Sequence, residues 1–295
     1  MENGSLEESG IKKGKTYKLK VLVNETFSFE ITKELEEHIV WRDYLDKLLT
    51  NFPKNIYDIC SYGVSEMVNN AIEHSEGNKL IVTIVIDAIN IHISIIDDGI
   101  GIFNKIKRDC GIDHPRYAIL ELSKGKLTSD EKKHSGQGIF FTSRMFDLFE
   151  IISENLLFAH DEKYNDWLFE DDKISTKGTT IYMTISKYSK RLSEEVFNNY
   201  SSNNDLGFDK TIVPVKLLQY GKENLVSRSQ ARRLLVRFDK FKEIVLDFKG
   251  VNIIGNSFID EIFRVFKIEH PGINIYPINA DENVMNNIIG IGLIE

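Results

Sequence analysis

The stretch SEMVNNAIEHS, residues 65–75, predicts a helix with two unlike faces. Glu66, Asn70 and His74 are spaced by four, so they fall within a narrow arc of that helix. A carboxylate, an amide and an imidazole aligned in this way indicate either a ligand site or an ordinary solvent-facing row. The buried stripe on the other side has the i, i+3, i+4, i+7 spacing and consists of Val64, Met67, Val68 and Ala71.

The composition is that of a globular protein with room for two domains. The chain has 295 residues, of which 42% are apolar and 28% are charged. Its net charge of -8 argues against a general nucleic-acid or anionic-membrane binder, because both need a cationic surface. A local basic patch stays open as an alternative.

The cysteines and the apolar runs indicate a cytoplasmic protein. Cys60 and Cys110 are the two cysteines, which suggests neither a disulfide framework nor a cysteine metal site. The first fifteen residues lack the apolar segment of a signal peptide, and no run approaches the ~20 apolar residues of a membrane helix. We therefore expect a protein that stays out of the membrane.

The first two-thirds of the chain predict an α+β layer domain at residues 16–186, after a polar tail at 1–15. Residues 103–135 are charged and poorly periodic, which indicates a functional loop or disorder. The remaining segments predict helices on one side of a mostly antiparallel sheet. Strands are expected at 16–23, 27–32, 79–88, 90–97, 148–153, 156–160, 166–170 and 179–186, and helices at 32–51, 56–76 and after the glycines at 136–138.

The last third predicts a second, smaller domain. Residues 187–208 are rich in Asn and Ser and are typical of a linker. From residue 209 to residue 295, strands and helices alternate as in an α/β domain.

Two glycine motifs join the polar helix row as candidates for a site. Asp97-Asp98-Gly99-Ile100-Gly101 follows a predicted strand, where glycines allow a tight turn and a carboxylate can accept a hydrogen bond from an amino group. Gly136-Gln137-Gly138 opens a predicted helix, whose free N–H groups attract phosphate. Each motif alone is weak evidence, and the order of the three is what makes them specific.

That order, E-x-x-x-N-x-x-x-H, then D-x-G-x-G, then G-x-G, resembles the GHKL ATPase domain of histidine kinases, gyrase and related proteins. The resemblance is greatest to the anti-sigma-factor serine kinases and covers residues 16–186. It implies the two-layer α/β sandwich called the Bergerat fold, with ATP and Mg²⁺ as ligands. The segment 103–135 then corresponds to a lid over the nucleotide.

The resemblance also implies roles for single residues. Asn70 would ligate Mg²⁺, and Glu66 would act as the general base. Asp97 would accept a hydrogen bond from the adenine amino group. His74 would face phosphate, or it is an exposed helix histidine. The glycines that would let the base, the lid and the triphosphate approach the backbone are Gly99, Gly101, Gly136 and Gly138.

Residues 209–291 resemble the STAS-like domains that are fused to such ATPases and that serve as anti-sigma antagonists. Their phosphoacceptor stands at the start of a helix. Here that place holds Gly255-Asn256-Ser257-Phe258, so Ser257 is either a phosphoacceptor or a helix N-cap.

The helix expected at residues 228–240 carries a row of arginines away from its apolar stripe: Arg228, Arg232, Arg233 and Arg237. Ser227 and Gln230 predict a capping box at its start. The row is a solvated face, a docking surface for an acidic partner or, less in keeping with the net charge, a nucleic-acid contact.

Two functions follow from these patterns. The first is a regulatory ATPase or serine/threonine protein kinase of the anti-sigma type that takes part in partner switching. Its partners would be a sigma-factor-like or antagonist-like protein and its own STAS-like domain, and a homodimer is compatible. The alternative is a nucleotide-gated interaction protein without phosphoryl transfer.

Overall fold

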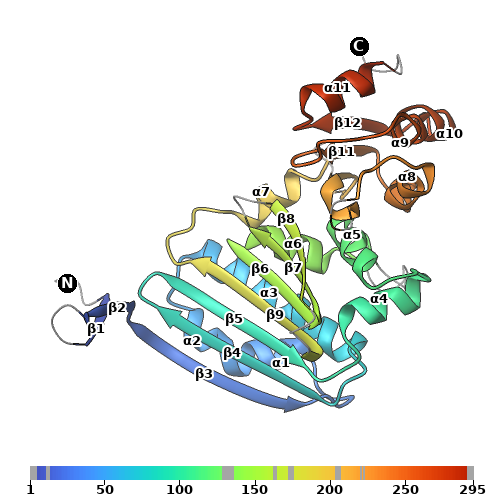
Figure 1. Ribbon diagram of the computed structural model, residues 1–295. Helices are drawn as coiled ribbons and strands as arrows, with labels where there is room; N and C mark the ends of the chain where they lie inside the picture. The colour runs from blue at the N-terminus through green and yellow to red at the C-terminus, as the bar shows by residue number, and fades with distance from the viewer. Residues whose placement is uncertain are drawn as a thin grey trace.

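The computed structural model describes residues 5–10, 14–127, 136–161, 165–171, 176–202, 207–219, 221 and 223–290. A large sheet carries helices on one face, and a small α/β module stands at the C-terminal end of the molecule (Figure 1). This arrangement confirms the predicted fold class of an α+β layer domain followed by a small α/β domain.

The large sheet has seven strands in which every neighbouring pair is antiparallel. Side chains alternate between its two faces, so Val82 and Ile84 are buried under the helices while Thr83 between them faces the other side. Strands β1 (Leu6–Ser9) and β2 (Thr16–Leu19) form a separate hairpin. The order in the large sheet is β3 (Val21–Glu30), β4 (Lys79–Asp87), β5 (Asn90–Asp97), β9 (Thr176–Ser186), β6 (Leu148–Glu154), β7 (Leu156–Asp161) and β8 (Asn165–Glu170).

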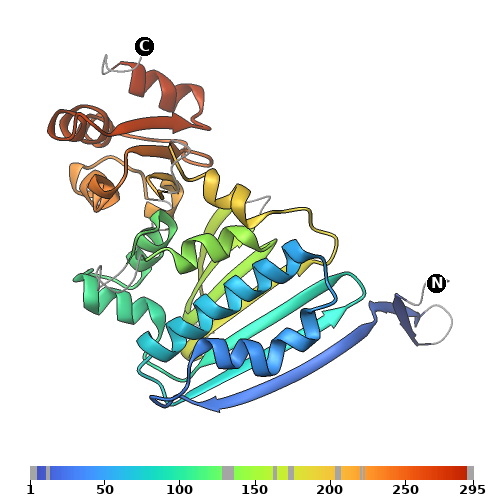
Figure 2. The same ribbon diagram turned by 180° about the vertical axis from the view of Figure 1, so that it is seen from behind.

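One face of this sheet is covered by the helical layer (Figure 2). Its longest member is α3 (Lys54–His74), which lies beside α6 (Gly138–Met145). Gly63 permits their close approach, since a Cβ there would stand 2.5 Å from Cε2 of Phe146. A run of helical turns precedes α3: α1 (Glu37–Val40), the π-helical η2 (Trp41–Leu45) and α2 (Asp46–Leu49).

The segment 103–135 is not the loop that its charges indicate, at least up to residue 127. It contains α4 (Ile102–Cys110) and α5 (Arg116–Lys124), and residues 128–135 lie outside the described part of the chain. The expectation of a loop or disorder is wrong for residues 103–127, because nine-residue helices offer only about two turns over which a period can be recognised. Its buried apolar side chains are Phe103, Ile106, Ala118, Ile119, Leu120 and Leu122.

The Asn- and Ser-rich segment 187–208 also contains regular structure. Helix α7 (Ser193–Asn198) packs on α6, with the ring centroids of Phe141 and Phe197 4.5 Å apart. Phe208 lies 4.7 Å from Phe140 in the same way. These aromatic contacts anchor the described parts of a segment whose polar composition is typical of a linker.

The C-terminal module is built on three parallel strands in the order β10 (Lys210–Pro214), β11 (Glu243–Asp247) and β12 (Asn274–Ile278). Parallel neighbours need crossover connections, which the helices supply. In chain order these are η3 (Val215–Leu218), α8 (Arg228–Leu235), η4 (Phe238–Lys240), α9 (Asn256–Ile259), the π-helical η5 (Asp260–Val265), α10 (Phe266–Glu269) and α11 (Glu282–Ile289).

Two helix-start predictions in this module have different outcomes. The capping box of Ser227 and Gln230 is confirmed, with the Gln230 backbone N donating to Ser227 Oγ over 3.2 Å. Ser257 is not an N-cap, because α9 begins at Asn256 after Gly255 and has no side-chain cap. Among the described residues, no helix combines the length and the apolar character needed to cross a membrane.

Candidate functional site

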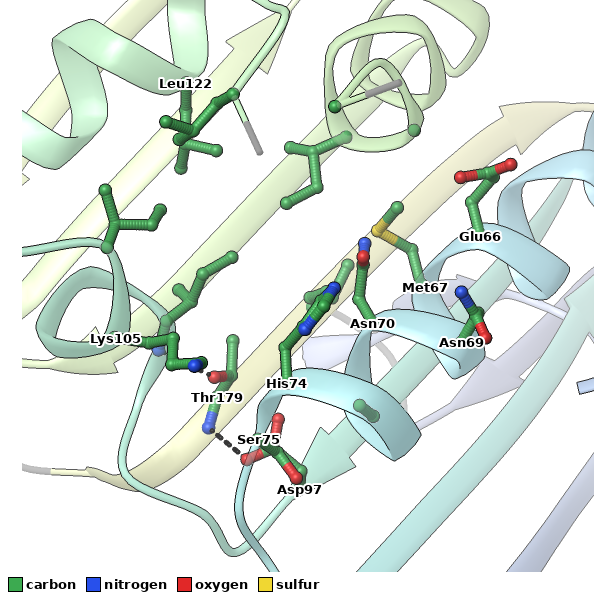
Figure 3. A pocket seen from close by; sticks show the side chains of 18 of the residues that line it. Glu66, Met67, Asn69, Asn70, His74, Ser75, Asp97, Lys105, Leu122 and Thr179 are labelled. Atoms are coloured by element: carbon green, nitrogen blue, oxygen red, sulfur yellow. Dashed lines mark hydrogen bonds between the residues drawn. The ribbon is translucent and has the colours of Figure 1, made fainter. Parts of the chain in front are cut away.

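The three motifs meet around one cavity of about 320 Å³, here called the α3 cavity (Figure 3). Helix α3 contributes Glu66, Asn70 and His74, and the end of β5 contributes Asp97. Its volume lies at the lower end of the range for small-molecule sites, roughly 300–1,000 Å³. The predicted glycines that line it are Gly101, Gly136 and Gly138.

Gly99 has a structural place behind the cavity. A Cβ on Gly99 would stand 2.0 Å from the backbone O of Ser75, so the glycine lets the turn pack on the end of α3. The backbone N–H of Ile100 donates to that same oxygen over 2.9 Å. The second motif is thereby fixed to the helix that carries the first.

Asp97 is a buried carboxylate, with 7% of its surface exposed. Its Oδ1 accepts from the backbone N–H of Gly99 at 2.9 Å and of Thr179 at 3.2 Å. Burial nevertheless raises the pKa of Asp97 above its ordinary value, against the effect of these hydrogen bonds. The group offers an acceptor at the floor of the cavity, suited to an amino or ring N–H group of a ligand.

Glu66 lies against the first turn of α6. A Cβ on Gly138 would stand 2.0 Å from Oε2 of Glu66, so this contact requires a glycine. The carboxylate is therefore brought to a helix start, whose first N–H groups have no partner within the helix. Gly136 is also constrained, since its φ is +64° and a Cβ would meet the Leu127 backbone at 2.5 Å.

Asn70 offers the cavity a buried polar group. Its Nδ2 is buried and has no hydrogen-bond partner among the described residues. A buried, unsatisfied amide costs about 1–3 kcal/mol, and such groups are rare without a functional reason. Its side chain points toward the cavity, whereas that of Asn69 points to another side of α3 (Figure 3).

The charged neighbours of the cavity are already paired. Lys105 Nζ lies 2.6 Å from Asp109 Oδ2 and 3.5 Å from Glu76 Oε1. His74 is partly exposed, and its Nε2 lies 3.8 Å from Glu73 Oε2. Within the described part of the chain, no group of three or more His, Cys, Asp or Glu side chains could hold a metal ion.

Sequence reasoning missed Gly178 and Thr179 on β9, which complete the Asp97 side of the cavity. A Cβ on Gly178, whose φ is +74°, would stand 2.0 Å from the Asp97 backbone O. Thr179 binds Asp97 through its N–H, and its Oγ1 accepts from the Ile102 N–H over 3.1 Å. A glycine inside a strand-like run marks a close backbone approach, and that signal was present in the sequence.

Ser257, like Gly99, is a predicted site residue that does not line the cavity. It is exposed near the start of α9, in the C-terminal module. Helices α5 and α8 separate α9 from α3 in both views (Figures 1 and 2).

Comparison with known proteins bears on the C-terminal module. Residues 230–285, from α8 to α11, match the family model of a STAS-like domain of unknown function (DUF4325). No GHKL ATPase domain is detected in the chain by the same comparison. No curated protein matches it. The chain therefore carries a STAS-like domain that follows a large antiparallel sheet domain in the sequence. The α3 cavity belongs to the sheet domain.

Proposed function

We propose that this protein is an ATP- and Mg²⁺-binding regulator of the anti-sigma-factor kinase type. It hydrolyses ATP or phosphorylates a protein Ser or Thr, and its STAS-like domain serves as a regulatory module. The observation that carries the proposal is the convergence of three separate polar motifs on the α3 cavity, where Asn70 has a buried and unsatisfied amide.

The two ends of the cavity suit the two ends of ATP. Asp97 offers a carboxylate acceptor at one end, where an adenine amino group is a matching donor. Gly136 and Gly138 line the cavity at the start of α6, where N–H groups and the helix dipole favour an anion such as phosphate. His74 and Gly101 also line the cavity.

The polar row of α3 suits the chemistry of phosphoryl transfer. Asn70 would hold Mg²⁺ through its amide oxygen, a hard ligand, and its amide nitrogen could donate to a phosphate oxygen. Bound Mg²⁺ neutralises phosphate charge. Glu66 stands one helical turn away with a carboxylate that can accept a proton from water or a hydroxyl group.

The alternative, a nucleotide-gated interaction protein without phosphoryl transfer, is supported by the position of Ser257. Asn256 falls at the usual place of the STAS phosphoacceptor and Ser257 one residue later, and α9 lies in the C-terminal module, away from α3 (Figure 1). Transfer to this serine would therefore require another copy or a large rearrangement. A sigma-factor-like or antagonist-like protein is the other expected acceptor or partner.

Incubation of the full chain with γ-labelled ATP and Mg²⁺ distinguishes these functions. Free labelled phosphate indicates hydrolysis, and label retained on protein indicates kinase activity. Binding of Mg-ATP without release or transfer of label supports the interaction switch. Absence of binding would overturn the assignment of the α3 cavity to ATP.

A further inference from the structure

Helix α5 belongs to both parts of the molecule. Leu122 lines the α3 cavity. Thr211 of β10 reaches the end of the same helix, where its Oγ1 donates to the Lys124 carbonyl over 2.8 Å. A nine-residue helix thus forms part of the cavity wall and part of the contact with the STAS-like domain.

Lys124 makes the central contact between the two. Its side chain is 1% exposed, and its Nζ lies 2.6 Å from Glu121 Oε1. The same Nζ donates to the carbonyl oxygens of Val236, at 3.0 Å, and Arg233, at 3.5 Å. These carbonyls stand at the C-terminal end of α8, where a cation is favoured by the helix dipole. Lys124 therefore caps a helix of the other domain.

Glu121 is also paired across the contact. It is buried, and it accepts a hydrogen bond from Arg237 of the STAS-like domain. Arg237 has a left-handed backbone with φ of +63°, which is uncommon for a residue other than glycine. Arg233 stacks on the ring of Tyr117 in α5 at 4.1 Å and donates to its hydroxyl over 3.1 Å. We call Glu121, Lys124 and Arg237, with the Val236 carbonyl, the α5 clasp.

The arginine row of α8 is thereby divided by function. Arg228 and Arg232 bind acidic side chains of their own domain, with Arg228 Nη2 3.0 Å from Asp260 Oδ2. Arg233 and Arg237 instead hold α5. In this half of the row the arginines contact a helix of the same chain, Arg237 through the Glu121 carboxylate and Arg233 through the Tyr117 ring and hydroxyl.

The clasp is complete only while the two domains are in contact. A buried ammonium and a buried carboxylate are tolerated when each is paired and hydrogen-bonded, and they become costly when a partner is removed. Separation of the STAS-like domain would take from Lys124 its carbonyl acceptors and from Glu121 its guanidinium. Both side chains would then turn to water, and the position of Leu122 in the cavity wall would lose this support.

We propose that the STAS-like domain regulates the α3 cavity through the α5 clasp, so that ligand occupancy of the cavity and docking of the domain favour each other. This inference rests on the proposed function for its ligand, Mg-ATP. By reciprocity, a protein that covers the end of α8 would weaken nucleotide binding by the same factor by which nucleotide weakens that protein's binding. The end of α8, with Arg237 and the Val236 carbonyl, suits a helix that presents a carboxylate and an ammonium three residues apart, as Glu121 and Lys124 do.

The test compares two arginine substitutions in the full chain. Arg237→Ala removes one partner of the clasp and alters no residue that lines the cavity. Arg228→Ala is the matched control, because it removes an arginine on the outer face of α8 that binds Asp260. Lys124→Met tests the clasp from the side of α5, and circular dichroism checks that each variant is folded.

The measurements are calorimetric affinity for Mg-ATP and hydrogen exchange with and without it. In the parent and in Arg228→Ala, we expect Mg-ATP to slow exchange in both α5 and α8. In Arg237→Ala and Lys124→Met, we expect faster exchange in α5 without ligand, no response in α8, and affinity weaker by about fivefold or more.

Unchanged affinity together with an unchanged α8 response in folded Arg237→Ala would overturn the regulatory inference and leave the nucleotide assignment standing. Failure of the parent protein to bind Mg-ATP would overturn the proposed function, and the inference with it.

Discussion

Helices α3 and α5, which both line the α3 cavity, are held in place by different means. Helix α3 is 21 residues long and buries Val64, Met67 and Val68 in the core of its own domain. Helix α5 has nine residues, and part of its support comes from the STAS-like domain through Lys124 and Glu121. Glu66 and Asn70, which are proposed to take part in the chemistry, therefore stand on a helix that its own domain holds in place. Helix α5, which the second domain helps to hold, is the element proposed for regulation.

The largest expected effect concerns helix α3. Asn70→Ala should abolish the gain in ATP affinity that Mg²⁺ provides, because a methyl group cannot replace an oxygen ligand. Titration of ATP with Mg²⁺ and with a chelator measures this gain. Asn69→Ala is the comparison, since Asn69 also borders the cavity but donates its Nδ2 hydrogen to Glu73 on the same helix. Equal Mg²⁺ dependence in the Asn70 variant and the parent would remove Asn70 from the metal site.

The second prediction separates nucleotide binding from catalysis on the same helix. Glu66→Gln should keep nucleotide affinity and lower turnover by ~10²–10⁴-fold, because the amide preserves shape and cannot accept a proton. Phosphate release at saturating ATP measures the effect. Glu73→Gln, an exposed position two turns along α3, should behave like the parent. Turnover that survives in Glu66→Gln would exclude this residue as the base.

The third prediction concerns pH at the floor of the cavity. Burial raises the pKa of Asp97, so the free protein should protonate this group at a pH above that of an ordinary aspartate. ATP affinity should therefore fall as the pH falls through the raised pKa, by about 1.5–3 kcal/mol if a charged hydrogen bond is lost. The stability of the fold should change in the opposite direction. It should rise as the pH falls through the raised pKa, because protonation relieves the desolvation penalty of the buried Asp97 carboxylate.

Asp97→Asn is the control for this titration. It should bind ATP more weakly than the parent at neutral pH and should lose the pH dependence in the acid window. Calorimetric affinities over a series of buffers measure both. A parent protein whose affinity does not change on acidification would argue against Asp97 as the acceptor.

The smallest expected effect tests whether α3 and α5 are held in place independently. Thr211→Val removes the hydroxyl that donates to the Lys124 carbonyl over 2.8 Å, which should cost about 1 kcal/mol. Hydrogen exchange should accelerate in α5 and stay unchanged in α3. Thr83→Val, on the outer face of β4, serves as the control. Equally faster hydrogen exchange in α3 and α5 would mean that the two helices are not stabilised independently.

Much of the fold was predictable because its signals are local. Strict alternation in β4 and the helical period of α3 reflect which faces are buried, and both elements stand close to their expected bounds. The capping box of α8 was predictable for the same reason. Helices α4 and α5 were not predicted because each spans only nine residues, too few turns for its period to stand out among the surrounding charges. Thr179 was missed although its neighbour Gly178 gave a usable signal.

The sequence by itself determined the layers, the alternation of the C-terminal module and the three motifs of the α3 cavity, since periodicity and glycine placement follow from local backbone geometry. Only the tertiary structure decided which members of the arginine row face α5. Arg228 and Arg237 look alike in a helical pattern, yet one binds Asp260 of its own domain and the other binds Glu121. The physical reason is that a contact between distant segments depends on how their domains pack, and neither segment's own pattern encodes it.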